Sequence, residues 1–177
     1  MNDIVPLAEP SVFDLPVLEQ SQASAAALTT VIERRYLAIV SGQPRHLEGK
    51  VDAPLARSSV NRKKIAIVPE GRGKRAVTHW RMLTPLKDAA LMECKLETGR
   101  THQVRVHMES IGHPLVGDPV YGRMRPAHIT ILKQLGFARQ ALHAAVIGFI
   151  HPVDRKYLRF ESKLPHDLQR LLSELSV

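Results

Sequence analysis

Residues 91–108 read LMECKLETGRTHQVRVHM, and the hydrophobic period of this stretch changes halfway along it. Up to Leu96, apolar and charged residues alternate one by one, which is typical of a strand with one buried face. Thr98 and Gly99 then interrupt the alternation, as turn residues do. The stretch therefore predicts a strand that ends in a turn, and the strongest structural signals of the chain gather around that junction.

The residues after this turn show helical spacing. Val104, Met108 and Ile111 recur at i, i+4 and i+7, with Thr101 as the expected N-cap and Gly112 as the expected stop. A strand-to-helix turn of this kind presents backbone N–H groups and long side chains at the end of a sheet. The turn is therefore a candidate for binding or catalysis.

Other segments also show clear strand or helix patterns. Helices are predicted over 23–35 and 129–135 and after Pro165, and strands over 36–40, 64–68, 76–83, 141–150 and 156–162. Because these elements follow no regular βαβ order, they predict an α+β fold with a mixed, mainly antiparallel sheet and flanking helices. An irregular acidic leader over 1–21 is expected before a domain over 22–177.

Charge is distributed unevenly along the chain. Residues 1–33 contain five acidic side chains and no Lys or Arg, whereas the remaining residues carry a net charge of +13. Ten basic and three acidic residues fall within 45–81. An exposed basic segment favours a polyanionic partner, and nucleic acid is the commonest one. The competing interpretation is a solvated basic surface that keeps the protein soluble.

Composition excludes several classes of protein. The 177 residues suit one domain, and 44% hydrophobic with 24% charged residues indicates a globular chain rather than a disordered one. No apolar run approaches the roughly 20 residues that cross a bilayer, and no secretory signal is found, so no membrane partner is expected. A single cysteine, Cys94, rules out an internal disulfide, and a cytoplasmic location is expected.

Neither a metal site nor a cofactor is indicated. His102 and His107 are five residues apart, which is not the spacing of a zinc-binding helix, and no glycine-rich phosphate loop is found. Cys94 is expected on the buried face of its strand as an inert core residue. Arg105 lies beside Val104 on the predicted helix. A buried arginine requires a carboxylate or a phosphate, and the sequence does not choose between them.

Two neighbouring stretches, 96–108 (LETGRTHQVRVHM) and 112–122 (GHPLVGDPVYG), closely resemble the signature of the RluA-type pseudouridine synthases. Further blocks at 35–42, 51–55, 76–80 and 140–144 resemble other family blocks in the same order. The resemblance extends over roughly residues 22–177. It implies a pseudouridine synthase catalytic-domain fold that is incomplete at its N-terminus.

The resemblance implies an isomerase that converts uridine to pseudouridine in RNA without cofactor or metal. The uridine is flipped out, its N1 glycosidic bond breaks, the uracil rotates, and a bond to C5 forms. Tyr36 is expected to stack on the flipped base, and Arg105 to pair with the catalytic aspartate. Leu96 and Val104 are expected to line the apolar side of the pocket. Large-subunit ribosomal RNA is the favoured substrate, with transfer RNA as the alternative.

Basic side chains are the expected RNA contacts. They are Arg62, Lys63, Lys64, Arg72 and Lys74 in the basic segment, together with Arg100 and His102 in the turn. The last two are expected either to position RNA or to brace the turn.

One family feature is not found in the sequence. The family's catalytic aspartate lies in a His-Arg-Leu-Asp motif, and no such motif occurs here. Glu9 falls at the aspartate's expected position with no arginine before it, and Asp14 is another local carboxylate. Three interpretations follow: a partial domain whose aspartate lies upstream, a paralogue that binds RNA without catalysis, or an active variant that uses Glu9 or Asp14.

On the sequence alone, we predict that the purified chain binds structured RNA with an affinity that falls steeply with salt, because phosphate contacts release counterions. Little pseudouridine is expected, since the aspartate motif is not found. RNA-binding titrations at several salt concentrations measure the affinity, and chemical mapping measures the pseudouridine formed. Salt-independent binding contradicts the prediction. So does robust conversion that is lost on Glu9→Gln or Asp14→Asn.

Overall fold

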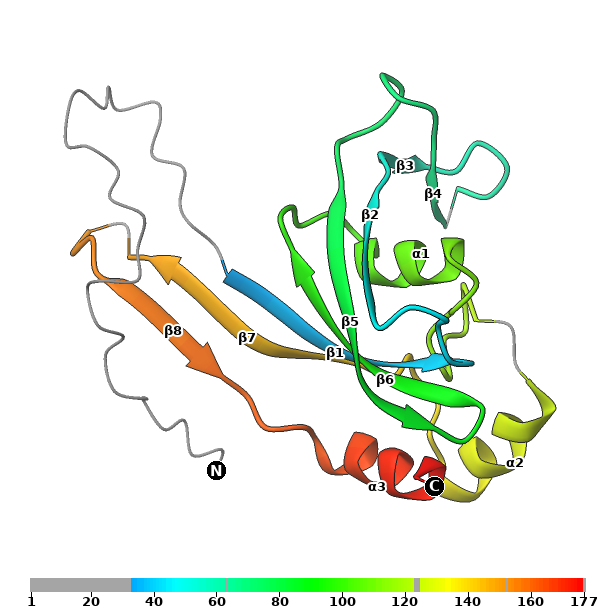
Figure 1. The fold of residues 1–177 in the computed structure, drawn as a ribbon. Helices are drawn as coiled ribbons and strands as arrows, with labels where there is room; N and C mark the ends of the chain where they lie inside the picture. Colours follow the sequence, from blue (N-terminus) through cyan, green and yellow to red (C-terminus); the bar gives the residue numbers. More distant parts are fainter. Residues whose placement is uncertain (1–32, 63, 123–124, 152, 177) are drawn as a thin grey trace.

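A six-stranded antiparallel sheet forms the centre of the structure (Figure 1). The computed structural model describes residues 33–62, 64–122, 125–151 and 153–176. The strand order is β2 (Glu48–Asp52), β5 (Val77–Leu86), β6 (Ala89–Leu96), β1 (Glu33–Ser41), β7 (Leu142–Ile150) and β8 (Tyr157–Glu161). The helices are α1 (Gln103–Ser110), α2 (Pro126–Leu135) and α3 (His166–Leu175). The predicted α+β class with a mainly antiparallel sheet is confirmed, and all strand pairs among the described residues are antiparallel.

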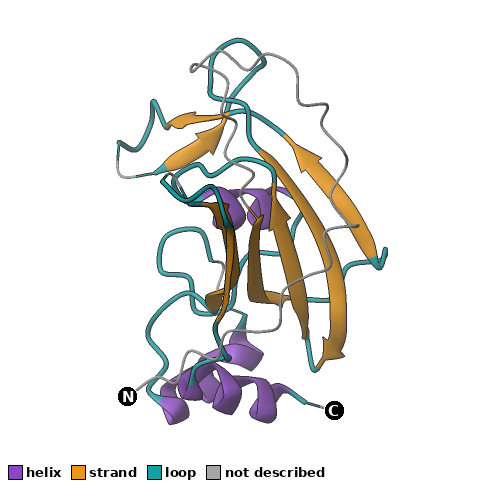
Figure 2. Ribbon diagram, turned by 90° about the vertical axis from the view of Figure 1, so that its left-hand side faces the viewer, coloured by secondary structure: helices purple, strands orange, loops and turns teal. Residues whose placement is uncertain are grey.

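Helices pack on opposite faces of the sheet because side chains alternate along each strand. Ala38 and Val40 of β1 lie in one apolar cluster with Val104 of α1. Ile39, between them in sequence, belongs to a second cluster with Leu168 of α3. Figure 2 shows α2 and α3 together at one end of the molecule. The sheet therefore separates α1 from the pair formed by α2 and α3.

A two-stranded ribbon, β3 (Leu55–Arg57) and β4 (Ile65–Ile67), stands apart from the main sheet beside α1 (Figure 1). Leu55 is buried with Val106 of α1 and Tyr121, and Ile65 packs against them. Since Val104 faces the sheet, α1 is held from two sides. The helix and the turn before it therefore lie at the junction between sheet and ribbon.

The predicted N-cap of α1 is wrong, whereas the predicted stop of the helix is confirmed. The N-cap residue is His102, not Thr101; its φ is 56° and it makes no side-chain capping hydrogen bond. The stop at Gly112 is confirmed, with φ 85°. The N–H groups of Gly112 and His113 donate to carbonyls of the last turn at 3.0 and 2.9 Å, which is a Schellman motif.

The predicted helix over 23–35 is wrong over its described end. Residues 33–35 are the first residues of β1, which pairs with β6 on one side and β7 on the other. Pairing with two neighbouring strands outweighs a weak local helical preference. The rest of that segment and the expected leader over 1–21 lie outside the described residues. The predicted strands and the other predicted helices each correspond to an observed element.

Candidate functional site

A buried ion pair joins α1 to the loop that follows it. Arg105 Nε and Nη2 each donate to one carboxylate oxygen of Asp118 at 2.8 Å. The Arg105 side chain is 9% exposed and that of Asp118 is 0% exposed. Asp118 Oδ1 also accepts the backbone N–H groups of Val120 and Tyr121 at 2.9 and 3.1 Å. These bonds fix the loop onto the helix.

Both members of this pair are charged at neutral pH. Burial by itself would raise the pKa of Asp118, because a low-dielectric site disfavours the charged form. The hydrogen bond from Arg105 and the two backbone N–H groups outweigh burial, so the pKa of Asp118 lies below its ordinary value. The hydrogen bond to Asp118 raises the pKa of Arg105. A buried carboxylate with both oxygens occupied is not available as a nucleophile or a base, so Asp118 does not replace the missing aspartate.

The expectation that Arg105 pairs with the catalytic aspartate stays a prediction, because the aspartate motif is not found in the sequence. Among the described residues, the carboxylate partner of Arg105 is Asp118. Sequence reasoning missed this residue, although the signal was present: a buried arginine requires an acid, and Asp118 opens a turn only 13 residues further on. Arg105 Nη1 has no hydrogen-bond partner within the described ranges, so that nitrogen is left for a second acceptor.

Tyr36, Leu96 and Val104 meet in one apolar cluster on the face of the sheet that α1 covers. Leu96 and Val104 are buried, whereas Tyr36 is half-buried. The pairing of β1 with β7 skips Ala145 beside Tyr36, and such a bulge re-aims the side chains next to it. The structure therefore brings the expected aromatic residue and apolar wall together, with Arg105 next along the helix.

A buried polar network seats α1 on β5. Gln103 Nε2 donates to Val77 O at 2.9 Å and to Thr78 Oγ1 at 3.0 Å. His107 lies within hydrogen-bond distance of Thr78 Oγ1 through Nδ1 (2.9 Å) and of Ala53 O through Nε2 (3.1 Å). Because a carbonyl only accepts, Nε2 carries the proton and Nδ1 accepts from Thr78. Burial lowers the pKa of His107, so the ring is neutral near pH 7.

The Tyr121 hydroxyl connects α1 to the ribbon. It accepts the backbone N–H of Ile65 at 2.8 Å and lies 3.0 Å from His102 Nδ1. Burial and the charge of Arg105 lower the pKa of His102, so its ring is neutral near pH 7. Arg105 and Lys64 lie over the Tyr121 ring, 4.9 and 5.7 Å from its centroid. The Tyr121 side chain therefore contacts the ribbon, the turn before α1 and the Arg105–Asp118 ion pair.

The predicted RNA contacts fall into separate places. Arg72, Lys74 and Arg100 line one hollow between the ribbon and the turn. Lys64 is half-buried over Tyr121, and Arg62 is exposed at the ribbon's turn, outside that hollow. Three predicted residues, Lys63, Glu9 and Asp14, lie outside the described residues.

Among the described residues, metal-binding groups and the Cys94 thiol contribute no further candidate site. No three His, Cys, Asp or Glu side chains in the part of the chain that the structure describes are grouped to hold a metal ion. Burial raises the pKa of the Cys94 thiol to about 12, which leaves it protonated and unreactive at neutral pH. Among the described helices, none has the length and apolar character needed to cross a membrane.

Comparisons with known proteins identify the same family that the sequence motifs resemble. A family model described as RNA pseudouridylate synthase matches residues 19–110. Ribosomal large subunit pseudouridine synthase D of Zymomonas mobilis is 65% identical over 146 residues, which are 82% of this chain and 46% of that protein. The uncharacterized RNA pseudouridine synthase YlyB of Bacillus subtilis is 44% identical over 144 residues, 81% of this chain and 44% of that one. The chain thus spans about half the length of the curated relatives it matches.

Two solved human structures share the fold. Human RNA Pseudouridylate Synthase Domain Containing 1 gives a TM-score of 0.63 at 25% identity, over 76% of this chain and 55% of that one. Domain Containing 4 gives 0.62 at 26% identity, over 81% and 62%. The fold and the matched motif define a domain of the class that modifies RNA bases. The chain belongs to the RNA pseudouridylate synthase family.

We predict that Arg105→Met lowers the free energy of unfolding by about 3–5 kcal/mol, because it leaves Asp118 buried without its cation. Asp118→Asn is expected to cost less, since an amide oxygen still accepts the N–H groups of Val120 and Tyr121. The double variant Arg105→Met/Asp118→Asn removes both charges and should recover part of the loss. Urea unfolding measures all three, and an Arg105→Met protein as stable as the parent would refute the prediction.

Stability is predicted to fall as pH drops from about 7.5 to about 5, because the unfolded chain takes up a proton as pH falls through the ordinary histidine pKa of about 6.5. The pKa of His107 is lowered in the folded state, so only the unfolded chain gains this proton as pH falls. His107→Gln keeps one donor and one acceptor without titrating, and its melting temperature should change less over this range. Parent and variant share the contributions of His102 and His128, whose pKa values are also lowered. Equal slopes for the two proteins would be evidence against this role of His107.

Proposed function

We propose that this protein acts on RNA as a pseudouridine synthase of the RluA type. The observation that carries the proposal is the meeting of Tyr36, Leu96 and Val104 in one apolar cluster, with Arg105, which Asp118 fixes, following Val104 on α1. A flipped uracil has an aromatic face, which suits stacking on a tyrosine and contact with an apolar wall. The names of the curated relatives support the same activity.

In this proposal each residue has a separate task. Tyr36 stacks on the flipped uracil, and Leu96 and Val104 exclude water from its other side. Arg105 Nη1 orients the catalytic carboxylate through a charge-assisted hydrogen bond. Asp118 is a positioning residue, because it holds Arg105 through Nε and Nη2 and leaves Nη1 facing away from it.

The reaction is an isomerisation and needs no external reagent. The bond between C1′ of the ribose and N1 of the uracil breaks, the base turns, and C1′ bonds to C5. The proton on C5 is lost to solvent or a base, and N1 takes up a proton, so the atoms of uridine and pseudouridine balance. A carboxylate supplies the nucleophile or base for this sequence, and none of the described residues is assigned to that role.

Large-subunit ribosomal RNA is the proposed substrate, and the cytoplasm the proposed location. The relative from Zymomonas mobilis is named for the ribosomal large subunit, and the basic segment over 45–81 suits a phosphate backbone. Transfer RNA serves as the comparison substrate in the test.

The test measures conversion of uridine in unmodified large-subunit ribosomal RNA and in transfer RNA. The sequence alone predicts little conversion, whereas membership of the family and the Tyr36 cluster lead us to expect conversion in the ribosomal RNA by the parent chain. Tyr36→Leu should reduce the rate about 10-fold or more by removing the stacking contact, whereas Tyr36→Phe keeps it. Arg105→Lys should reduce the rate about 100-fold, because a lysine cannot hold Asp118 and a second acceptor together. Lys87→Ala, at an exposed position, is the control and should leave the rate unchanged.

The same assay separates the active variant from the other two interpretations. Conversion that is lost on Glu9→Gln or Asp14→Asn identifies the carboxylate. RNA binding without any conversion would overturn the proposed activity for this chain and support either the RNA-binding paralogue or the partial domain whose aspartate lies upstream. Conversion that is insensitive to Tyr36→Leu and Arg105→Lys would overturn the assigned site.

A further inference from the structure

A hollow of about 680 Å³ lies between the β3–β4 ribbon and the turn before α1. Its lining combines two kinds of side chain. Leu55 is 4% exposed and Ile65 is half-buried, and these give it an apolar floor. Exposed cationic residues surround them: Arg57, Arg72, Lys74 and Arg100. No acidic side chain lines the hollow among the described residues, and its volume falls within the roughly 300–1,000 Å³ of small-molecule sites.

The cations of this hollow have no carboxylate partners in the described structure. Arg72 and Lys74 make no side-chain hydrogen bond or ion pair there. Arg100 donates through Nε to Arg75 O at 3.0 Å, which fixes the side chain and leaves its two terminal nitrogens for another acceptor. Arg57 donates through Nη1 to Arg62 O at 3.2 Å. Each of these bonds positions a guanidinium without neutralising it.

Several arginines elsewhere on the surface form ion pairs. Arg75 pairs with Glu97 at 2.9 Å, Arg81 with Glu93 at 3.0 Å, and Arg139 with Asp167 at 2.7 Å. Other exposed cations of the described surface, Lys87 and Lys156 among them, also form no ion pair, so what distinguishes the hollow is that four unpaired cations gather around one apolar floor. A set of unpaired cations around an apolar floor is complementary to an anion that carries a flat apolar group.

The walls of the hollow are fixed relative to each other. The hydrogen bond from Ile65 N–H to the Tyr121 hydroxyl ties the ribbon wall to the loop after α1, and Leu55 is buried with Val106 of α1. The opposite wall, the turn over 99–101, is braced where Gln103 Oε1 accepts the Arg100 N–H at 3.0 Å. A preorganised site of this kind loses less entropy when it binds a ligand.

We propose that this hollow binds a single-stranded segment of the RNA substrate, with one base on the Leu55–Ile65 floor and the adjoining phosphates on the surrounding cations. The inference rests on the proposed function and adds a second RNA subsite to it, separate from the Tyr36 cluster. A base can reach the floor only if it is unstacked, which excludes the bases of a continuous duplex. The ribbon thus holds RNA next to the flipped uridine.

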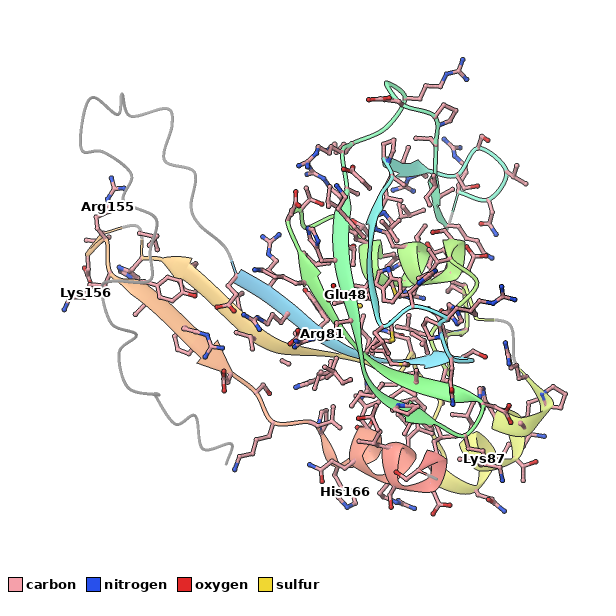
Figure 3. The ribbon with its side chains drawn as sticks, viewed as in Figure 1. Glu48, Arg81, Lys87, Arg155, Lys156 and His166 are labelled. Atoms are coloured by element: carbon pink, nitrogen blue, oxygen red, sulfur yellow. The ribbon has the colours of Figure 1, made fainter. Side chains whose placement is uncertain are left out.

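The test is fluorescence anisotropy of the full chain with a fluorescein-labelled hexauridylate at about 0.1 M salt. Arg72→Ala/Lys74→Ala is expected to weaken binding about 10-fold and to lower the salt dependence of the affinity. The matched control is Lys87→Ala/Lys156→Ala, which removes the same charge from exposed positions. Figure 3 shows Lys87 near α2 and α3 and Lys156 at the tip of the β7–β8 hairpin, away from the ribbon. The control should change affinity less than about 2-fold.

Two further probes test the floor. An abasic oligonucleotide of the same length should bind the parent several-fold more weakly, and a duplex RNA should be insensitive to Arg72→Ala/Lys74→Ala. Equal weakening by the two double variants would overturn the subsite and leave only general charge attraction. Polyglutamate binding with the same dependence on Arg72 and Lys74 would assign the hollow to an acidic polypeptide instead. Loss of hexauridylate binding is measured separately from uridine conversion, so the subsite and the proposed activity can fail independently.

Discussion

The structure depends on one buried ion pair, Arg105 with Asp118. Placing two charges where water does not reach is costly, and the pair is tolerated because both carboxylate oxygens and two backbone N–H groups are satisfied together. The interaction also sets positions: it fixes the loop that carries Tyr121, and Tyr121 in turn fixes the ribbon. Because desolvation of the two charges offsets much of their attraction, such a pair adds little net stability. Its main effect is to hold the Arg105 guanidinium in one orientation.

The second constraint is the double support of α1. Val104 packs toward the sheet and Val106 toward the ribbon, while Gln103 and His107 bond to Thr78. A short helix with a left-handed N-cap residue and no capping side chain depends on such contacts, since isolated helices of this length are unstable. Contacts with the sheet and the ribbon therefore fix the position of α1, and with it the positions of the residues along the helix.

Much of the fold follows from sequence periodicity, but less of the site does. The change of period at Gly99 predicted the strand, the turn and the helix, and Gly112 predicted where the helix stops. Residues 33–35 were mispredicted because pairing with β6 and β7 is a long-range effect that local preference does not contain. Asp118 and the hollow were missed for a similar reason. Asp118 is identified only once the burial of Arg105 is known. The hollow forms between segments that are distant in sequence.

The Tyr121 hydroxyl gives the ribbon an unusual kind of attachment. In the described structure, β3 and β4 pair with each other and not with the main sheet, and a side-chain oxygen receives the N–H of Ile65. A backbone bridge also holds the ribbon, since the N–H groups of Leu55 and Lys74 each donate to the carbonyl of the other at 2.9 Å. Both attachments lie outside the loop between Arg57 and Ile65, so insertions and deletions in that loop leave α1 undisturbed. The loop of the ribbon is thus free to diverge in length and sequence, while α1 and the Tyr36 cluster remain in place.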